Sequence, residues 1–159
     1  MCRFAAAVLL AFASAASPAH AETYVTGDIA TQTWTKEHSP YRIIGEVEVL
    51  YGDTLTIGPG VDVLFDAPVE FRVRGMIYAL GAQNDSIRFL PGDTTHWGGM
   101  RILTPGCDPA YHDCPHDRDT FRFEFMRISG VVNTWGGFVA AEGGFSPGLV
   151  MRDCVISNN

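Results

Sequence analysis

The sequence is poor in basic residues and contains no run of them. It has 11 Lys and Arg against 18 Asp and Glu in 159 residues, which gives a formal net charge of −7 at pH 7. Nucleic-acid affinity rests on clustered Lys and Arg side chains that neutralise phosphates. We therefore expect no nucleic-acid partner.

Long apolar segments and helical periods are also scarce. No segment keeps a helical hydrophobic period for as long as a stable helix needs. After residue 21, no apolar run approaches the roughly 20 residues of a transmembrane helix, so we expect no membrane span. Residues 1–21 are typical of a secretory signal, with Arg3 at a weakly basic start, an apolar stretch over residues 4–16, and small residues at Ala19-His20-Ala21. We expect cleavage after Ala21 and a mature protein that is secreted, periplasmic or at the cell surface.

Common catalytic signatures are missing as well. The sequence has no Gly-rich phosphate loop, no nucleophile elbow and no His-Glu-x-x-His motif. No catalytic residue and no cofactor are predicted. These absences favour a non-catalytic role over an enzyme.

What is present indicates a single all-β domain. The 17 Gly and 9 Pro residues stand among short runs of Val, Ile, Phe and Thr, a pattern of brief strands joined by tight turns. From residue 41 onward, alternating apolar positions are separated by turn signals. These signals are Gly52-Asp53, Pro59-Gly60, a turn near Gly75, and the segment 81–85.

Internal repetition predicts that these strands stack as coils. Trp97-Gly98-Gly99 recurs as Trp135-Gly136-Gly137, and an irregular insertion at residues 104–120 accounts for nearly half of the separation. When the insertion is left out, the remaining separation is close to the spacing between Ile57 and Ile77. It is also close to the spacing between Val63-x-Phe65 and Ile87-x-Phe89. A repeat of about 20 to 25 residues without a helix is typical of a β-solenoid, in which each coil buries its inward side chains against the next.

Short motifs of one kind run along residues 39–159: Ser39-Pro40-Tyr41, Gly45-Glu46-Val47, Gly52-Asp53-Thr54-Leu55-Thr56-Ile57, Pro59-Gly60-Val61, Trp97-Gly98-Gly99-Met100-Arg101-Ile102, Phe123-x-Phe125-Met126-Arg127-Ile128-Ser129-Gly130 and Cys154-Val155-Ile156-x-Asn158-Asn159. They resemble the N-terminal portion of bacterial secreted right-handed parallel β-helix repeat proteins of the pectin-lyase-like group. The resemblance implies an all-β, right-handed parallel β-helix (β-solenoid) with an N-terminal cap. It does not select an activity, because the group includes polysaccharide lyases, hydrolases, adhesins and proteins of unknown role.

The expected layout is a signal peptide at residues 1–21, an N-terminal cap or leader at residues 22–40, and coils at residues 41–159 with the insertion at 104–120. We expect the coils to continue beyond residue 159, because an uncovered last coil exposes unpaired backbone groups. Such an open coil also allows self-association. The expected interior positions are Ile44, Val47, Val49, Leu55, Ile57, Val61, Val63, Phe65, Val73, Ile77, Ile87, Phe89, Ile102, Phe123, Phe125, Ile128 and Val155.

The insertion carries the densest cluster of reactive side chains. Cys107 and Cys114 most simply form a disulfide that pins a surface loop of an exported protein. The alternative is a zinc site that adds His112 and His116, although the spacing is not that of a zinc finger and an oxidising compartment disfavours free thiolates. Cys154 is expected to be a small apolar side chain in the coil interior.

Charged residues alternate with the apolar ones and are expected to face outward. Among them, Arg72 and Arg74 are candidates for ligand contact. With Asp62 or Glu70 they could line a carbohydrate groove of the polysaccharide-lyase kind, which uses carboxylate-bound Ca²⁺ and a basic residue. The alternative is a solvated outer face without a ligand.

Two tryptophans are further candidates for ligand contact. The indole faces of Trp97 and Trp135 are suited to stacking on sugar rings. The alternative, and the favoured interpretation, is corner packing beside the Gly-Gly pair that follows each of them.

Two main hypotheses of function follow. The first is a non-catalytic extracytoplasmic scaffold or surface-binding β-helix module with a polysaccharide or cell-envelope partner. The second is a carbohydrate-active enzyme, of the polysaccharide lyase or hydrolase type, whose active groove lies mostly outside this chain and which could require Ca²⁺. A third is a passive piece of a larger adhesin.

Overall fold

Short strands account for most of the chain that the structure describes. The computed structural model describes residues 22–103, 120–134, 139–142 and 148–157. The strands are β1 (Thr23–Ile29), β2 (Gln32–Trp34), β3 (Tyr41–Val49), β4 (Thr54–Ile57), β5 (Asp62–Phe65), β6 (Phe71–Val73), β7 (Met76–Leu80), β8 (Ile87–Pro91), β9 (Met100–Leu103), β10 (Thr120–Glu124), β11 (Met126–Ser129), β12 (Val139–Glu142), β13 (Gly148–Arg152) and β14 (Val155–Ser157), with one 3-10 turn, η1 (Lys36–His38). Within these ranges no helix is long and apolar enough to cross a membrane.

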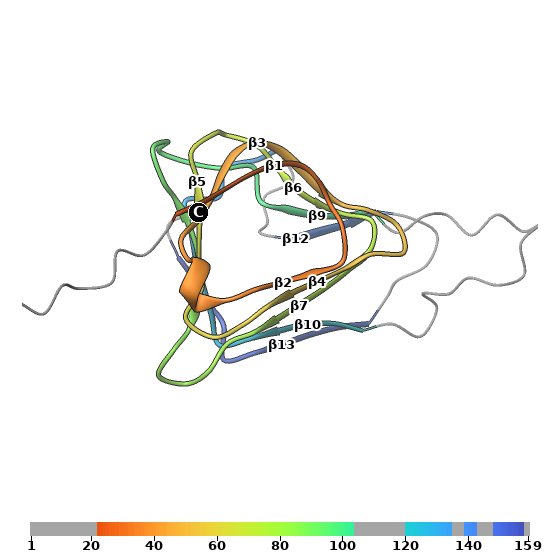
Figure 1. Ribbon diagram of the computed structural model, residues 1–159, viewed down its shortest axis with the longest axis vertical. Coiled ribbons are helices and arrows are strands. Elements are labelled where there is room, and N and C mark those ends of the chain that lie inside the picture. Colours follow the sequence, from red (N-terminus) through yellow and green to blue (C-terminus); the bar gives the residue numbers. More distant parts are fainter. Residues whose placement is uncertain (1–21, 104–119, 135–138, 143–147, 158–159) are drawn as a thin grey trace, which may run out of the picture.

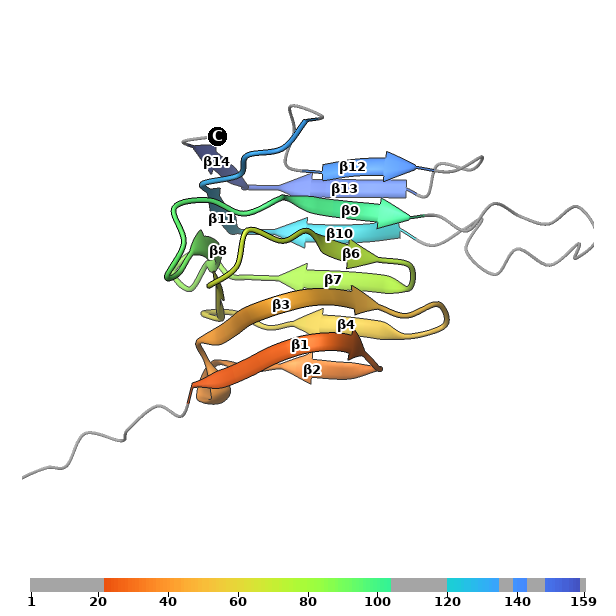
Figure 2. The same ribbon diagram turned by 90° about the horizontal axis from the view of Figure 1, so that it is seen from above.

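The strands wind into a parallel β-solenoid of about four turns, which confirms the predicted fold class. The first face stacks the N-terminal half of β3 on β5, β8, β11 and β14; the second stacks the C-terminal half of β3 on β6, β9 and β12; the third stacks β2, β4, β7, β10 and β13. Viewed down the stack, the three faces form a triangle (Figure 1). Viewed from the side, the coils lie one above another (Figure 2).

The segment expected to be a cap over residues 22–40 is itself built as a coil. Its strand β1 pairs in parallel with β3, and β2 pairs in parallel with β4. Trp34 at the end of β2 is 1% exposed, and its ring stacks on Tyr41 with centroids 4.5 Å apart. The leader therefore covers one end of the core by continuing the solenoid rather than by folding across it.

The register differs from the alignment that the sequence repeats predict. Ile77 pairs with Leu55 rather than with Ile57, and Val63 pairs with Phe89 rather than with Ile87. Side chains alternate between the two faces of a strand, so a slip of two positions leaves the same residues facing inward. This is why the interior is predicted well despite inexact alignment of the coils.

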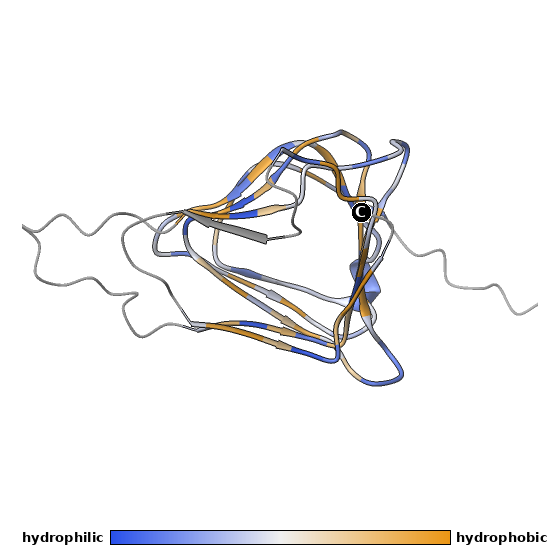
Figure 3. Cartoon of the chain, turned by 180° about the vertical axis from the view of Figure 1, so that it is seen from behind, coloured by the Kyte–Doolittle hydropathy of each residue, from blue (hydrophilic) through white to orange (hydrophobic). Residues whose placement is uncertain are grey.

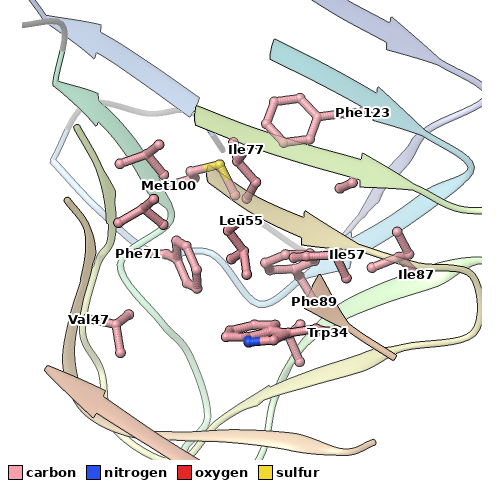
Figure 4. Close-up of a cluster of buried hydrophobic side chains, with 14 of the residues drawn as sticks. Trp34, Val47, Leu55, Ile57, Phe71, Ile77, Ile87, Phe89, Met100 and Phe123 are labelled. Carbon is pink, nitrogen blue, oxygen red and sulfur yellow. The ribbon is translucent and has the colours of Figure 1, made fainter. Parts of the chain in front are cut away.

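The core consists of inward ladders contributed by all three faces. Aliphatic and aromatic side chains meet at its centre (Figure 4). Hydrophobic and hydrophilic positions alternate along the strands (Figure 3). The expected interior positions that are buried are Val47, Val49, Leu55, Ile57, Val61, Val63, Phe65, Val73, Ile77, Ile87, Phe89, Ile102, Phe123 and Ile128.

Ile44 was predicted to face inward, and this is wrong. In β3 the buried positions are Tyr41, Ile43, Val47 and Val49, and strict alternation leaves Ile44 48% exposed. The register between β1 and β3 also shifts at this point, where the long strand bends from the first face to the second. Ile43 is the inward residue of the pair.

Phe125 and Val155 were also assigned to the interior, and neither is buried. Phe125 is only half-buried and has a φ of 49°, and Asp153 in the following coil has a φ of 51°. The backbone N–H of Phe125 donates to the carbonyl of Arg152, so both residues belong to one sharp corner that interrupts the alternation. Val155 is 55% exposed because it pairs with the outward Arg127.

Cys154 lies beside the core without being fully enclosed. It is half-buried and packs against the core cluster, with its Sγ 3.4 Å from the carbonyl oxygen of Phe123. The predicted disulfide of Cys107 and Cys114, the signal peptide and Trp135 fall outside the residues that the structure describes. Self-association stays a prediction, although four apolar side chains of the last two strands are exposed: Leu149, Met151, Val155 and Ile156.

Candidate ligand-binding surfaces

The second face brings Arg72 and Arg74 together with outward residues of both charges. Glu48 on β3, Arg72 on β6 and Arg101 on β9 are register partners in successive coils. Arg74 Nε lies 2.7 Å from Glu48 Oε1, and Arg72 Nε lies 3.5 Å from Glu70 Oε2.

These ion pairs neutralise the charges that Arg72 and Arg74 could otherwise offer to a ligand. Glu70 also lies 3.5 Å from Arg101 Nη1, so one carboxylate serves two guanidinium groups. Of the two candidate partners, Glu70 lies beside Arg72, whereas Asp62 is on the first face, where Arg88 binds it. The surface around Arg72 and Arg74 is a neutralised outer face, and in the described residues no three His, Cys, Asp or Glu side chains are placed to hold a metal ion.

Trp97 lies in the core of the solenoid rather than on its surface. Its side chain is fully buried, and its indole stacks on Phe65 with centroids 3.9 Å apart. The indole Nε1 donates to the carbonyl of Ser129, 2.9 Å away. The burial and the stacking favour corner packing for Trp97 over ligand contact.

The corner between the third and first faces holds a polar cleft that sequence analysis missed. Its volume is about 420 Å³, and its lining comes from η1, from the turn before β5, from the loop between β7 and β8, and from β8 and β11. In Figure 1 this loop projects at the lower left, after β7. The lining residues are Lys36, Gly60, Gln83, Asn84, Asp85, Ser86, Arg88 and Arg127.

Two ion pairs shape the cleft. Lys36 Nζ lies 2.8 Å from Asp85 Oδ1 and so ties the first coil to the loop after β7. Arg88 donates from Nε and Nη2 to the two carboxylate oxygens of Asp62, one coil earlier. This hydrogen bonding raises the pKa of Arg88 above its ordinary value, with burial opposing it. Arg88 is thus a fixed cation at the edge of the cleft.

Arg127 lies directly beside Arg88 in the ladder. The register places Asp62, Arg88 and Arg127 in succession on β5, β8 and β11, with Val155 next. Arg127 is exposed and makes no hydrogen bond or ion pair with another residue in the part of the chain that the structure describes. Like charges directly opposite each other on paired strands are unfavourable.

The opposite end of the first face is closed by a different ion-pair network. Arg42 Nη1 lies 2.8 Å from both carboxylate oxygens of Asp66, 3.5 Å from Asp93, and its Nε lies 3.2 Å from Glu22. The hydrogen bond to Asp66 raises the pKa of Arg42, so its charge is fixed. Arg42 is only 19% exposed, and this network joins successive coils instead of offering a binding site.

Sequence reasoning missed the cleft because its residues lie far apart in the chain. Of the three residues that the register brings together, sequence analysis singled out only Asp62, and the repeat unit was too irregular to align it with Arg88 and Arg127. The stretch of sequence from Arg88 to its register partner Arg127 is longer than that from Asp62 to Arg88. The longer stretch contains the insertion, so spacing in the sequence does not reveal that Arg88 and Arg127 are neighbours.

Comparison with family models, with curated proteins and with solved structures finds no match to this chain. The likeness to pectin-lyase-like proteins therefore rests on the sequence motifs. The structure supports the broader statement that the chain is a parallel β-solenoid.

Proposed function

We propose that this chain is a non-catalytic, extracytoplasmic β-solenoid module that binds a polysaccharide or another polar polymer of the cell envelope. The observation that supports the proposal is the polar cleft at the corner of the first and third faces. Its lining residues come from successive coils and the turns between them, so a polymer running along the solenoid can contact several coils at once.

The chemistry of the lining suits a hydroxyl-rich ligand. Gln83 and Asn84 each offer an amide donor and an acceptor, and Ser86 offers a hydroxyl group that does both. Arg88 and Lys36 add charged donors whose positions are fixed by ion pairs. Sites of this kind discriminate ligands through a few well-placed polar groups.

The proposed location outside the cytoplasm rests on the N-terminal residues. Residues 1–21 have the basic start, apolar stretch and small-residue cleavage site of a secretory signal. Determining the N-terminal sequence of protein recovered from a bacterial periplasm tests this. A first residue of Glu22 supports export, and an uncleaved chain retained in the cytoplasm refutes it.

Affinity electrophoresis through gels containing neutral or acidic polysaccharides, with and without Ca²⁺, tests the binding. The double substitution Gln83→Ala with Asn84→Ala is expected to weaken retention by about tenfold, since each lost hydrogen bond contributes about 1 kcal/mol or less. Gln32→Ala is the matched control, because Gln32 is an exposed amide on β2 and does not line the cleft. Equal retention of both variants and the wild type contradicts the proposal.

The same polysaccharides separate binding from catalysis. A lyase produces unsaturated products that absorb ultraviolet light, whereas a binding module leaves the absorbance unchanged. A Ca²⁺-dependent rise in absorbance would replace the proposal by the enzyme hypothesis.

A further inference from the structure

The cleft contains two arginines, of which one is paired with a carboxylate and the other is not. Arg88 and Arg127 are register partners on β8 and β11, and both side chains are exposed. Arg88 has one carboxylate partner, Asp62, on the side away from Arg127. The next outward residue beyond Arg127 is Val155, which brings no negative charge.

The two guanidinium groups differ in how many of their N–H donors make hydrogen bonds. Asp62 occupies Nε and Nη2 of Arg88, and Nη1 of Arg88 makes no hydrogen bond within the described part of the chain. Arg127 has no hydrogen-bond partner among those same residues. A strand pair places side chains of register partners side by side, so these donors lie at one place on the surface.

The remaining charges of the cleft do not compensate for this. Asp85 is the one carboxylate in the lining, and Lys36 binds both of its oxygens, at 2.8 and 3.0 Å. A cationic spot therefore persists on a chain whose formal net charge is −7. Planar guanidinium groups bind oxyanions through paired N–H donors, which a single ammonium group cannot reproduce.

We propose that Arg88 and Arg127 together bind an oxyanion group, a carboxylate or a sulfate, of the ligand that occupies the cleft. The anion lies between the two guanidinium groups and relieves their repulsion. Arg88 is held in place by Asp62, and Arg127 gains its partner when the anion binds. The inference rests on the proposed function only where it takes the ligand to be a polymer. Binding of an inorganic anion requires the two arginines alone.

The first experiment uses inorganic sulfate as the probe. The ¹⁵N-labelled protein is titrated with sodium sulfate against sodium chloride at equal ionic strength, and the Nε–H signals of the arginines are followed. We expect sulfate-specific shifts at Arg88 and Arg127. Arg127→Gln should weaken sulfate binding by about tenfold, the factor that corresponds to losing one charge-assisted contact.

A matched control is available on the third face. Arg122 is also exposed and outward, but it binds Glu124 at 2.7 Å and does not line the cleft. Arg122→Gln makes the same charge change and should leave sulfate binding unaltered. Equal weakening by both substitutions, or shifts spread over all arginines, indicates general electrostatics and overturns the inference.

Thermal unfolding supplies a second readout that does not depend on signal assignment. A ligand that binds only the folded state raises its stability. Sulfate should therefore raise the Tm of the wild type and of Arg122→Gln more than that of Arg127→Gln. Without sulfate, Arg127→Gln should be at least as stable as the wild type, since it removes a like-charge contact; a large loss of stability contradicts the assigned geometry.

Polymers on one backbone then identify the source of the anion. Dextran, carboxymethyl dextran and dextran sulfate differ only in their charged groups. Retention of either charged polymer, reduced in Arg127→Gln, supports both proposals and shows which oxyanion is preferred. Sulfate binding without retention of any polymer supports the anion site and refutes the proposed function. Retention of neutral polysaccharides without any effect of sulfate or of Arg127→Gln supports the proposed function and overturns the anion site.

Discussion

Arg42 and Asp66 join two successive coils through a guanidinium nitrogen that lies 2.8 Å from both carboxylate oxygens. Asp66 is 11% exposed, and its Oδ1 also accepts the backbone N–H of Asp93 in the next coil at 2.9 Å. Hydrogen bonds to charged groups contribute more when they are shielded from water. This pair is therefore expected to contribute more to stability than the exposed ion pairs of the surface.

Asp66→Asn should lower the free energy of unfolding by about 1.5–3 kcal/mol, because it removes the charge that holds Arg42. Urea denaturation with a constant m-value measures this. Asp85→Asn is the matched control: its pair with Lys36 is 39% and 55% exposed, so the expected loss is below about 1 kcal/mol. Equal losses in the two variants would show that the network around Arg42 has no special role.

Gly75→Ala should destabilise the protein strongly. A Cβ at position 75 would clash with the carbonyl oxygens of Leu50 and Asp53, which are backbone atoms that cannot rotate away. We expect a loss of about 3 kcal/mol or more, in the range of strained or overpacked sites. Gly58→Ala is the control, since its Cβ would meet only the carbonyl oxygen of Trp34 at 3.5 Å, an ordinary contact. Comparable urea midpoints for the two variants would contradict the close approach of these turns.

Ile43 and Ile44 test the inward and outward assignment within β3. Ile43 is fully buried and Ile44 is 48% exposed. Ile43→Ala should cost about 2–4 kcal/mol through lost burial and a residual cavity, whereas Ile44→Ala should cost about 0.5 kcal/mol or less. The reverse order of the two urea midpoints would place Ile44 inward in β3 instead of Ile43.

Trp97→Ala should cost about 3–5 kcal/mol, because a fully buried indole stacked on Phe65 is lost. Trp97→Phe keeps an aromatic ring and should cost less. In both variants, polysaccharide retention per folded molecule should equal that of the wild type. A folded Trp97→Ala protein with weakened retention would assign the ring to the ligand after all.

The inward positions could be predicted from the sequence because alternation and turn residues act locally. Val63 and Phe65, for example, are inward whichever residues of the next coil they meet. Ile44 was misplaced because two adjacent isoleucines offer both phases of the alternation, and β3 keeps the phase of Val47 and Val49, which places Ile43 inward. Phe125 was misplaced because nothing local shows that a phenylalanine adopts a left-handed backbone conformation.

The cleft could not be predicted, because it depends on which residues of different coils become neighbours. Arg88 meets Arg127 only across the insertion, and Lys36 meets Asp85 although strands β3 to β7 separate them in the sequence. Local patterns contain no information on such offsets when the coils differ in length. Arg72 and Arg74 stood out in the sequence for their regular spacing. In the structure both lie on an outer face where Glu70 and Glu48 neutralise them.

The stacking of strands has a consequence for how the molecule opens. On each face a strand pairs only with the coil before it and the coil after it, so cooperativity extends along one dimension. We expect amide hydrogens of β5, β6 and β7, which have neighbours on both sides, to exchange more slowly than those of β2, which pairs on one side only. We therefore expect the solenoid to open in steps, with each coil's contribution to the free energy of unfolding depending mainly on its two neighbours.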